Sequence, residues 1–278
     1  MRFIGLLPLL LLFVFEFSPY GAANLAAHDL TVSDTTQANR YNFSQFGTET
    51  WRFFKQPISW EGSDWLKLGV TGVATVLIMQ VDQPIRDAVT KDQRYYRSVP
   101  IEAGRIWAEL PPPVLLLSGF ALYSWIADDM RTRKVAFELA QALLYSGGVH
   151  KVLNVTFGRA KPYDNEGPKS FHPFSQRAFN ANGDYQSMPG GHCVIAFAMS
   201  TVLSRNAGPL WLKGLAYLPA ALTFVSRIYQ DRHWTSDDFI GASLGYCTAT
   251  WVVDQHEQGE SRVHVASIFP LTVSITLD

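Results

Sequence analysis

The chain has 278 residues, a formal net charge of −1, 47% hydrophobic residues and 17% charged residues. Because this charge balance provides no basic surface, we expect no nucleic-acid partner. The charged fraction is below the roughly 25% of soluble domains, which favours a largely buried or membrane-embedded helical protein.

The first residues are typical of a secretory signal peptide, which we expect at 1–23. A positive start precedes an apolar run over 4–15, and small residues follow at 21–23. The alternative is a first transmembrane anchor, but the run is shorter than the ~20 residues of a spanning helix and Glu16 interrupts it. Residues 24–63 are polar and predict an exposed lead-in with one short amphipathic helix near 49–55.

The region 64–255 predicts an all-α bundle of about six core helices, which we expect to span a membrane. None of its apolar segments has 18 residues free of charges or proline clusters, so a soluble helical domain is the alternative. The prolines at 111–113 suit a helix start, and Pro219 suits a kink. The six segments are 65–81, 110–127, 135–153, 193–203, 210–225 and 239–253.

The cysteines and the C-terminal residues carry less information. Cys193 and Cys247 each lie in an apolar segment, where we expect buried free thiols rather than a disulfide. Residues 256–278 are rich in β-branched side chains and partly alternating, which predicts a short extended or β-like tail.

Three clusters of polar residues lie at the ends of apolar segments, where a polar group needs a physical reason. The most specific cluster is Ser226-Arg227, five residues, His233, three residues, Asp237. A helix would put His233 and Asp237 on one face, where a carboxylate can fix the tautomer of the imidazole. Arg227 could bind phosphate oxygens through two N–H groups. The alternative is that His233 and Asp237 only cap a helix starting near Ser236.

The second cluster is Pro189-Gly190-Gly191-His192, directly before an apolar run. Glycines before a helix start would present free backbone N–H groups to an anion, and His192 would lie beside that anion as a proton donor. The alternative is an ordinary turn.

The third cluster lies at the end of segment 135–153 and contains three cations. It is also what a positive flank of a membrane segment looks like. Its residues are His150, Lys151, Asn154, Gly158, Arg159, Lys161 and Pro162.

Together the clusters resemble the signature of the type-2 phosphatidic acid phosphatase family, over roughly 135–253. That signature is a Lys, six residues and Arg-Pro; then Pro-Ser-Gly-His; then Ser-Arg, five residues, His, three residues and Asp. The third motif matches completely. In the first motif Lys161 stands where the family has Arg, and Asn154 where it has Lys, although Lys151 lies one turn earlier. In the second motif Gly190 replaces Ser.

The resemblance implies a mechanism without a metal or other cofactor. His233 would attack phosphorus and form a phosphohistidine, Asp237 would orient His233, and His192 would protonate the leaving group. Phosphate would be held by a set of side chains and backbone amides. The expected members of this set are Arg227, Lys161, Gly190 and Gly191, with Lys151 and Arg159 as further candidates.

The resemblance also implies a location and a substrate class. We expect a bacterial-type cell envelope protein, integral to the membrane, with its site on the periplasmic or outer side. The substrate would be a lipid phosphate or pyrophosphate. Two alternatives stay open: a weak or inactive relative that binds a phosphorylated lipid, and a soluble exported acid phosphatase or haloperoxidase.

Overall fold

The computed structural model describes residues 40–176, 183–258, 263–268 and 271–275. The signal peptide expected at 1–23 and part of the expected lead-in lie outside these ranges. The chain divides into two units, Met1–Trp51 and Arg52–Asp278, and each is described by itself.

The first described helix, α3 (Phe43–Lys55), begins in the first unit. The backbone N–H of Gln45 donates to Oδ1 of Asn42 over 2.9 Å, so Asn42 caps the helix start. This cap explains why the helix begins before the predicted 49–55. A short 3-10 helix, η1 (Gln56–Ser59), follows α3.

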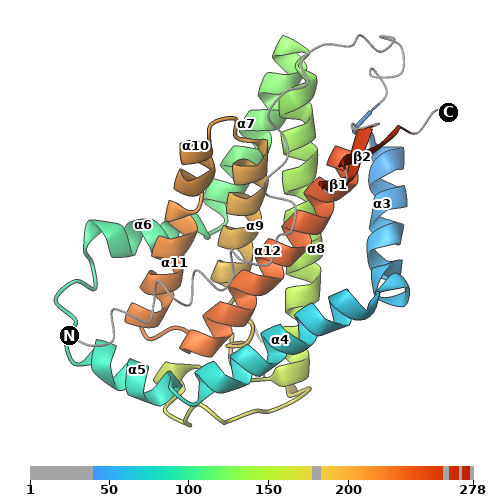
Figure 1. The fold of residues 1–278 in the computed structure, drawn as a ribbon. Coiled ribbons are helices and arrows are strands. Elements are labelled where there is room, and N and C mark those ends of the chain that lie inside the picture. Colours follow the sequence, from blue (N-terminus) through green and yellow to red (C-terminus); the bar gives the residue numbers. More distant parts are fainter. Residues whose placement is uncertain (1–39, 177–182, 259–262, 269–270, 276–278) are drawn as a thin grey trace. The chain divides into compact units, whose positions relative to one another are not determined.

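The second unit is all-α over its described residues up to Gln258, which confirms the expected fold class (Figure 1). Five predicted segments correspond to one long helix each, whereas α5 and α6 were not predicted. The elements are α4 (Gly62–Met79), α5 (Asp82–Thr90), α6 (Val99–Trp107), α7 (Pro111–Ala127), α8 (Met130–Phe157), η2 (Pro162–Asp164), α9 (Gly191–Asn206), α10 (Leu210–Leu215), α11 (Leu218–Tyr229) and α12 (Thr235–Gln258).

Prolines mark helix starts in this unit. Pro111 opens α7 as predicted. The segment 210–225 forms two helices, α10 and α11, instead of one kinked helix, and Pro219 lies in the first turn of α11. Pro84 likewise lies in the first turn of α5, so a new helix begins where the sequence predicted only a helix end. A first-turn proline is tolerated because its missing N–H would have no partner there.

The core lies where α8, α9 and α12 pack against one another (Figure 1). Leu139, Met199 and Val252, one from each helix, are fully buried there. A Cβ built on Gly245 of α12 would lie 2.2 Å from the carbonyl oxygen of Val194 on α9, so this crossing has no room for a side chain. A small residue at this position therefore allows the two helices to pack closely.

One end of this core gathers all three predicted clusters. The C-terminal end of α8, the N-terminal ends of α9 and α12 and the C-terminal end of α11 lie together, next to α5 (Figure 1, lower part). A two-stranded antiparallel hairpin, β1 (Val263–Ile268) and β2 (Leu271–Ile275), follows α12 and confirms the β-like tail.

Both cysteines are free. Cys193 is buried as expected, but the prediction is wrong for Cys247, which is exposed because its position on α12 turns away from the core.

Among the described helices, none is by itself long and apolar enough to cross a membrane. Two bent pairs pass the same criteria of length and composition together: α4 with α5, bent by 51°, and α6 with α7, bent by 61°. Large apolar side chains are exposed on several helices, among them Trp65 on α4, Trp125 on α7 and Trp211 on α10.

We predict that Gly245→Ala lowers the melting temperature, because its methyl group would overlap the Val194 carbonyl. The matched control is Gly147→Ala on α8, where nothing lies within 4 Å of the added carbon. The control should be neutral or stabilise by up to about 1 kcal/mol, the helix-propensity difference between Ala and Gly. Thermal unfolding followed by circular dichroism checks both, and equal melting temperatures would contradict the packing described here.

Candidate active site

His233 lies in the loop between α11 and α12, two residues before α12 begins. The helical i, i+4 relation to Asp237 therefore does not apply. Nδ1 of His233 lies 2.9 Å from the backbone carbonyl oxygen of Ser187. A carbonyl can only accept, so Nδ1 carries the proton and Nε2 keeps its lone pair.

The surroundings of His233 keep its ring neutral. Burial lowers the pKa of His233 well below 6.5, and the positive charges of Arg227 and Lys161 and the nearby His192 lower it further. Hydrogen bonding to Ser187 opposes this shift. At neutral pH the side chain is thus an uncharged imidazole with a fixed tautomer, which is the form a nucleophile needs.

Asp237 lies in the first turn of α12 and is fully buried. Its Oδ2 accepts from the Ser187 hydroxyl over 2.5 Å and from the Trp234 backbone N–H over 3.0 Å. The described contacts contain no hydrogen bond between Asp237 and His233, so Asp237 reaches His233 through Ser187 rather than directly. Burial raises the pKa of Asp237 to about 6, against the effect of Arg159 and Ser187, and the carboxylate is therefore ionised at neutral pH.

Arg159 is fully buried, and the structure assigns it a different task from the phosphate binding expected from the sequence. Its Nη1 donates to Oδ1 of Asp237 over 2.6 Å, and its Nη2 donates to Oδ2 of Asp82 over 2.8 Å. The remaining N–H groups donate to the Pro168 carbonyl and the Ser236 hydroxyl. With its donors used inside the protein, Arg159 has none left for a substrate.

His192 is the second residue of α9, and its ring centre lies 6.4 Å from that of His233. Burial lowers the pKa of His192 to about 3, and Arg227, Lys161 and His150 add to the shift in that order. The free site therefore holds His192 in its neutral form.

Two of the predicted phosphate ligands, Arg227 and Lys161, lie close enough to His192 and His233 for their charges to lower the pKa values of both rings. Arg227 is buried, and among the described residues its Nε has no hydrogen-bond partner. Burial lowers the pKa of Lys161, and Arg232 and Arg227 lower it further. Arg232 and the Lys161 ammonium both lie over the ring of Tyr163, at 5.4 and 5.6 Å. Such a cluster of cations suits an anionic ligand.

Sequence reasoning missed Arg232 as a neighbour of this site, and it placed His150 in the third cluster without giving it a role. Arg232 directly precedes His233, so its position beside the motif histidine was the available signal. The ring of His150 lies against Gly191, since a Cβ built there would be 2.9 Å from its Nε2. The i, i+4 spacing of His150 and Asn154 puts both on one face of α8, and this pattern was the available indication for His150.

Asn154 and Lys151, the two candidates for the motif lysine, take different positions. Asn154 is fully buried, and its side-chain amide donates to the carbonyl of Met188 over 3.1 Å. It therefore holds the turn of the second motif in place. Lys151 is exposed on α8, and the described residues give it no hydrogen bond or ion pair.

Gly190 does not offer the free amide that was expected of it. Its N–H donates to the backbone oxygen of Asp237 over 2.8 Å, so of the two glycines Gly191, the first residue of α9, is the one with the N–H of a free helix start. A Cβ on Gly190 would lie 2.3 Å from Oδ1 of Asp238. The buried Asp238 carboxyl therefore occupies the space that a serine would need.

The chain is similar to known proteins over its second half. Residues 135–260 match the family model described as PAP2 superfamily. The matched region contains every residue of the three motifs, whereas Asp82, which pairs with Arg159, lies outside it.

A lipid A 1-phosphatase from Porphyromonas gingivalis is 30% identical to this chain over 125 residues. The match covers 43% of this chain and 24% of that relative, so the chain matches about a quarter of the relative's length. No solved structure matches the chain significantly.

We predict that Gly190→Ser, which introduces the residue of the family motif, destabilises the protein because its side chain would overlap Asp238. In an Asp238→Ala background the same substitution should cost much less. Melting temperatures of the two single variants and the double variant form the test. Equal losses in both backgrounds would show that Asp238 does not exclude the serine.

We also predict that a bound dianion raises the pKa of His192, because it offsets the positive charges that depress that pKa. Binding should then take up protons, and affinity should rise as the pH falls toward the free-state pKa of about 3. Sulfate is the probe, since its own charge does not change near pH 6. Calorimetry in two buffers of different ionisation enthalpy gives the number of protons taken up for each sulfate bound. His192→Gln should reduce this number, and an unchanged number would assign the protons elsewhere.

Proposed function

We propose that this protein removes phosphate from a phosphorylated lipid through a phosphohistidine on His233. The observation that carries the proposal is the bond between Nδ1 of His233 and the Ser187 carbonyl, because it leaves the Nε2 lone pair available for attack. The match to the PAP2 superfamily supports a phosphatase, since the matched region includes all three motifs.

In the proposed first step, Nε2 of His233 attacks phosphorus and the bond from phosphorus to the leaving oxygen breaks. His192 gives its proton to that oxygen, so no negative charge builds up on the leaving oxygen of the alcohol or phosphate. In the second step, water attacks phosphorus, the bond between phosphorus and Nε2 of His233 breaks, His192 takes up a proton of the water, and free phosphate is released. The neutral state of His192 in the free site fits this cycle, because the substrate's negative charge would raise its pKa on binding.

Arg227 and Lys161 are proposed to bind the phosphoryl oxygens, together with the free backbone N–H groups at the start of α9. Their charges would stabilise the additional negative charge of the transition state, where fixed donors have their largest effect. Lys161 supplies a point charge rather than the planar fork of an arginine, so it binds with less directional specificity. Asp237 would stabilise the site indirectly, through its hydrogen bonds with Ser187 and Arg159.

A membrane lipid is the proposed substrate for two reasons. The similar protein from P. gingivalis is a lipid A 1-phosphatase. In addition, exposed apolar side chains on α4, α7 and α10 and the two bent helix pairs suit contact with a bilayer. We propose that the protein resides in a bacterial cell envelope with its site on the periplasmic or outer side.

The test is phosphate release by the detergent-solubilised protein in the presence of a chelator. The substrates are lipid A, phosphatidic acid, phosphatidylglycerol phosphate and a polyprenyl pyrophosphate. We expect release from at least one of them by the wild type and at least a 1,000-fold loss in His233→Ala, because the nucleophile is removed. Quenching in alkali and mass spectrometry should find a phosphoryl group on His233.

The matched control is His172→Gln. His172 is half exposed, and its side chain bonds to Glu166 and Ser170 rather than to Arg227, Lys161 or Arg232, so its loss should leave the rate unchanged. Activity of His233→Ala close to that of the wild type would refute the role of His233. A folded wild type that binds these lipids without releasing phosphate would favour the inactive relative.

A further inference from the structure

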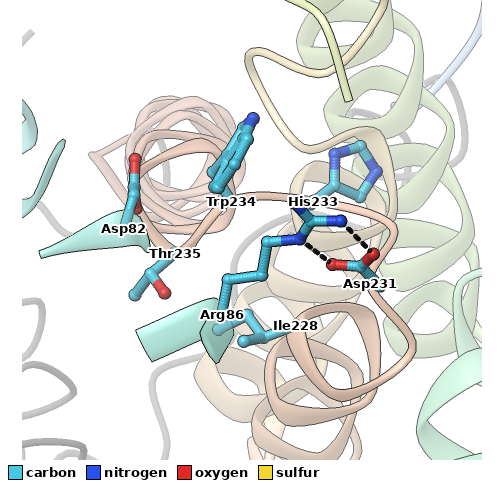
Figure 2. Close-up of a pocket in the computed structure, with 7 residues that line it drawn as sticks. All are labelled: Asp82, Arg86, Ile228, Asp231, His233, Trp234 and Thr235. Carbon is cyan, nitrogen blue, oxygen red and sulfur yellow. Dashed lines mark hydrogen bonds and ion pairs between the residues drawn. The ribbon is translucent and has the colours of Figure 1, made fainter. Parts of the chain in front are cut away.

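Helix α5 lies outside the region that matches the PAP2 superfamily, yet it contacts the loop that carries His233. Figure 2 shows Arg86 of α5 paired with the loop residue Asp231. Asp82 of the same helix bonds to Ser236 in the first turn of α12. Asp82 and Arg86 are four residues apart, so they lie on one face of α5. The sequence signature of the family includes neither residue.

Asp82 holds the segment on the C-terminal side of His233. It is almost fully buried, and its Oδ1 accepts from the Ser236 backbone N–H over 2.9 Å. Its Oδ2 accepts from the Ser236 hydroxyl over 2.5 Å and from Arg159 over 2.8 Å. Asp82 therefore fixes the first turn of α12 directly, through Ser236, and indirectly, through Arg159, which also pairs with Asp237.

Arg86 holds the segment on the N-terminal side of His233. Its Nε and Nη2 donate to the two carboxylate oxygens of Asp231 over 2.7 and 2.8 Å (Figure 2). Its Nη2 also donates to Asn165, and the guanidinium lies 5.6 Å from the ring centre of Trp234. Asp231 has a left-handed backbone with φ of 58°, a conformation that needs such support outside glycine.

The two anchors therefore lie on either side of the nucleophile. Asp231 precedes His233 by two residues, and Ser236 follows it by three. Between these anchors the imidazole bonds through Nδ1 to the Ser187 carbonyl, and the neighbouring Trp234 bonds to Asp237 and to the Ala160 carbonyl. A shift of the loop would lengthen the bond to Ser187 and move Nε2 away from the line of attack.

We propose that α5 is a positioning element of the active site, in which Asp82 and Arg86 fix the loop that presents His233. This inference rests on the proposed function. Asp82 and Arg86 are positioning residues, because their hydrogen bonds go to Arg159, Ser236, Asp231 and Asn165 and not toward the cation cluster that would bind phosphate.

The test compares kcat and KM of Asp82→Asn, Arg86→Gln and Arg86→Lys with those of the wild type. Asp82→Asn keeps the shape and removes the charge, and Arg86→Gln removes the bidentate contact with Asp231. We expect kcat to fall by about 10- to 100-fold in both, because small misplacements of a reacting group have effects of this size. KM should stay within about twofold. Arg86→Lys keeps the charge and should recover part of kcat.

The matched control is Arg94→Gln, which removes an exposed ion pair with Asp92 in the segment after α5. Its kcat should equal that of the wild type. Hydrogen exchange of the peptide covering 230–238 provides a readout that does not depend on turnover. Exchange should rise in Asp82→Asn and Arg86→Gln in this peptide, while α8 keeps its protection.

Unchanged kcat in Asp82→Asn and Arg86→Gln would overturn the inference, whatever the exchange data show. A change in KM alone would also overturn it, since the residues would then bind substrate. These outcomes differ from a failure of the proposed function, in which the wild type and Arg94→Gln would themselves release no phosphate.

Discussion

The candidate site depends on one buried guanidinium. Arg159 lies between the carboxylates of Asp82 and Asp237, and all three side chains are almost fully withdrawn from solvent. Burying charges is costly unless each is paired and hydrogen-bonded, and here the donors of Arg159 are all used. Losing one partner of such a group typically costs about 3–5 kcal/mol, because a charge stays buried without compensation. The three side chains thereby hold α5, the segment after α8 and the first turn of α12 in fixed positions.

The charge distribution around His233 follows from this arrangement. Since Arg159 is paired with carboxylates, the positive charges that lower the pKa values of His192 and His233 include those of Arg227 and Lys161. These charges, together with burial, keep both rings neutral in the free site. A bound anion would offset these charges, so we expect it to raise the pKa of His192, the residue proposed as the acid.

The departures from the family motif also have structural explanations. Asn154 is buried and bonds to the Met188 carbonyl, so this position holds the second motif in place. Gly190 leaves the space that the Asp238 carboxyl fills, and its amide bonds to α12. A change at either position therefore affects packing between α8, α9 and α12 first. This makes these two departures poor indicators of lost activity, because the Asn154 side chain bonds to the Met188 carbonyl and Gly190 has no side chain.

The sequence by itself determined the helical class, the long helices and the order of the three motifs, because apolar runs and fixed spacings are local properties. It also identified His192, Arg227 and His233, which lie close to one another in the structure. It could not determine the tautomer of His233, the buried task of Arg159, or the contribution of Asp82 and Arg86. These depend on contacts such as the 77-residue separation between Arg159 and Asp82, and no local pattern encodes such a pairing. Tertiary packing, including that of α5 against the α11–α12 loop and the bond to the Ser187 carbonyl, decides how His233 is held.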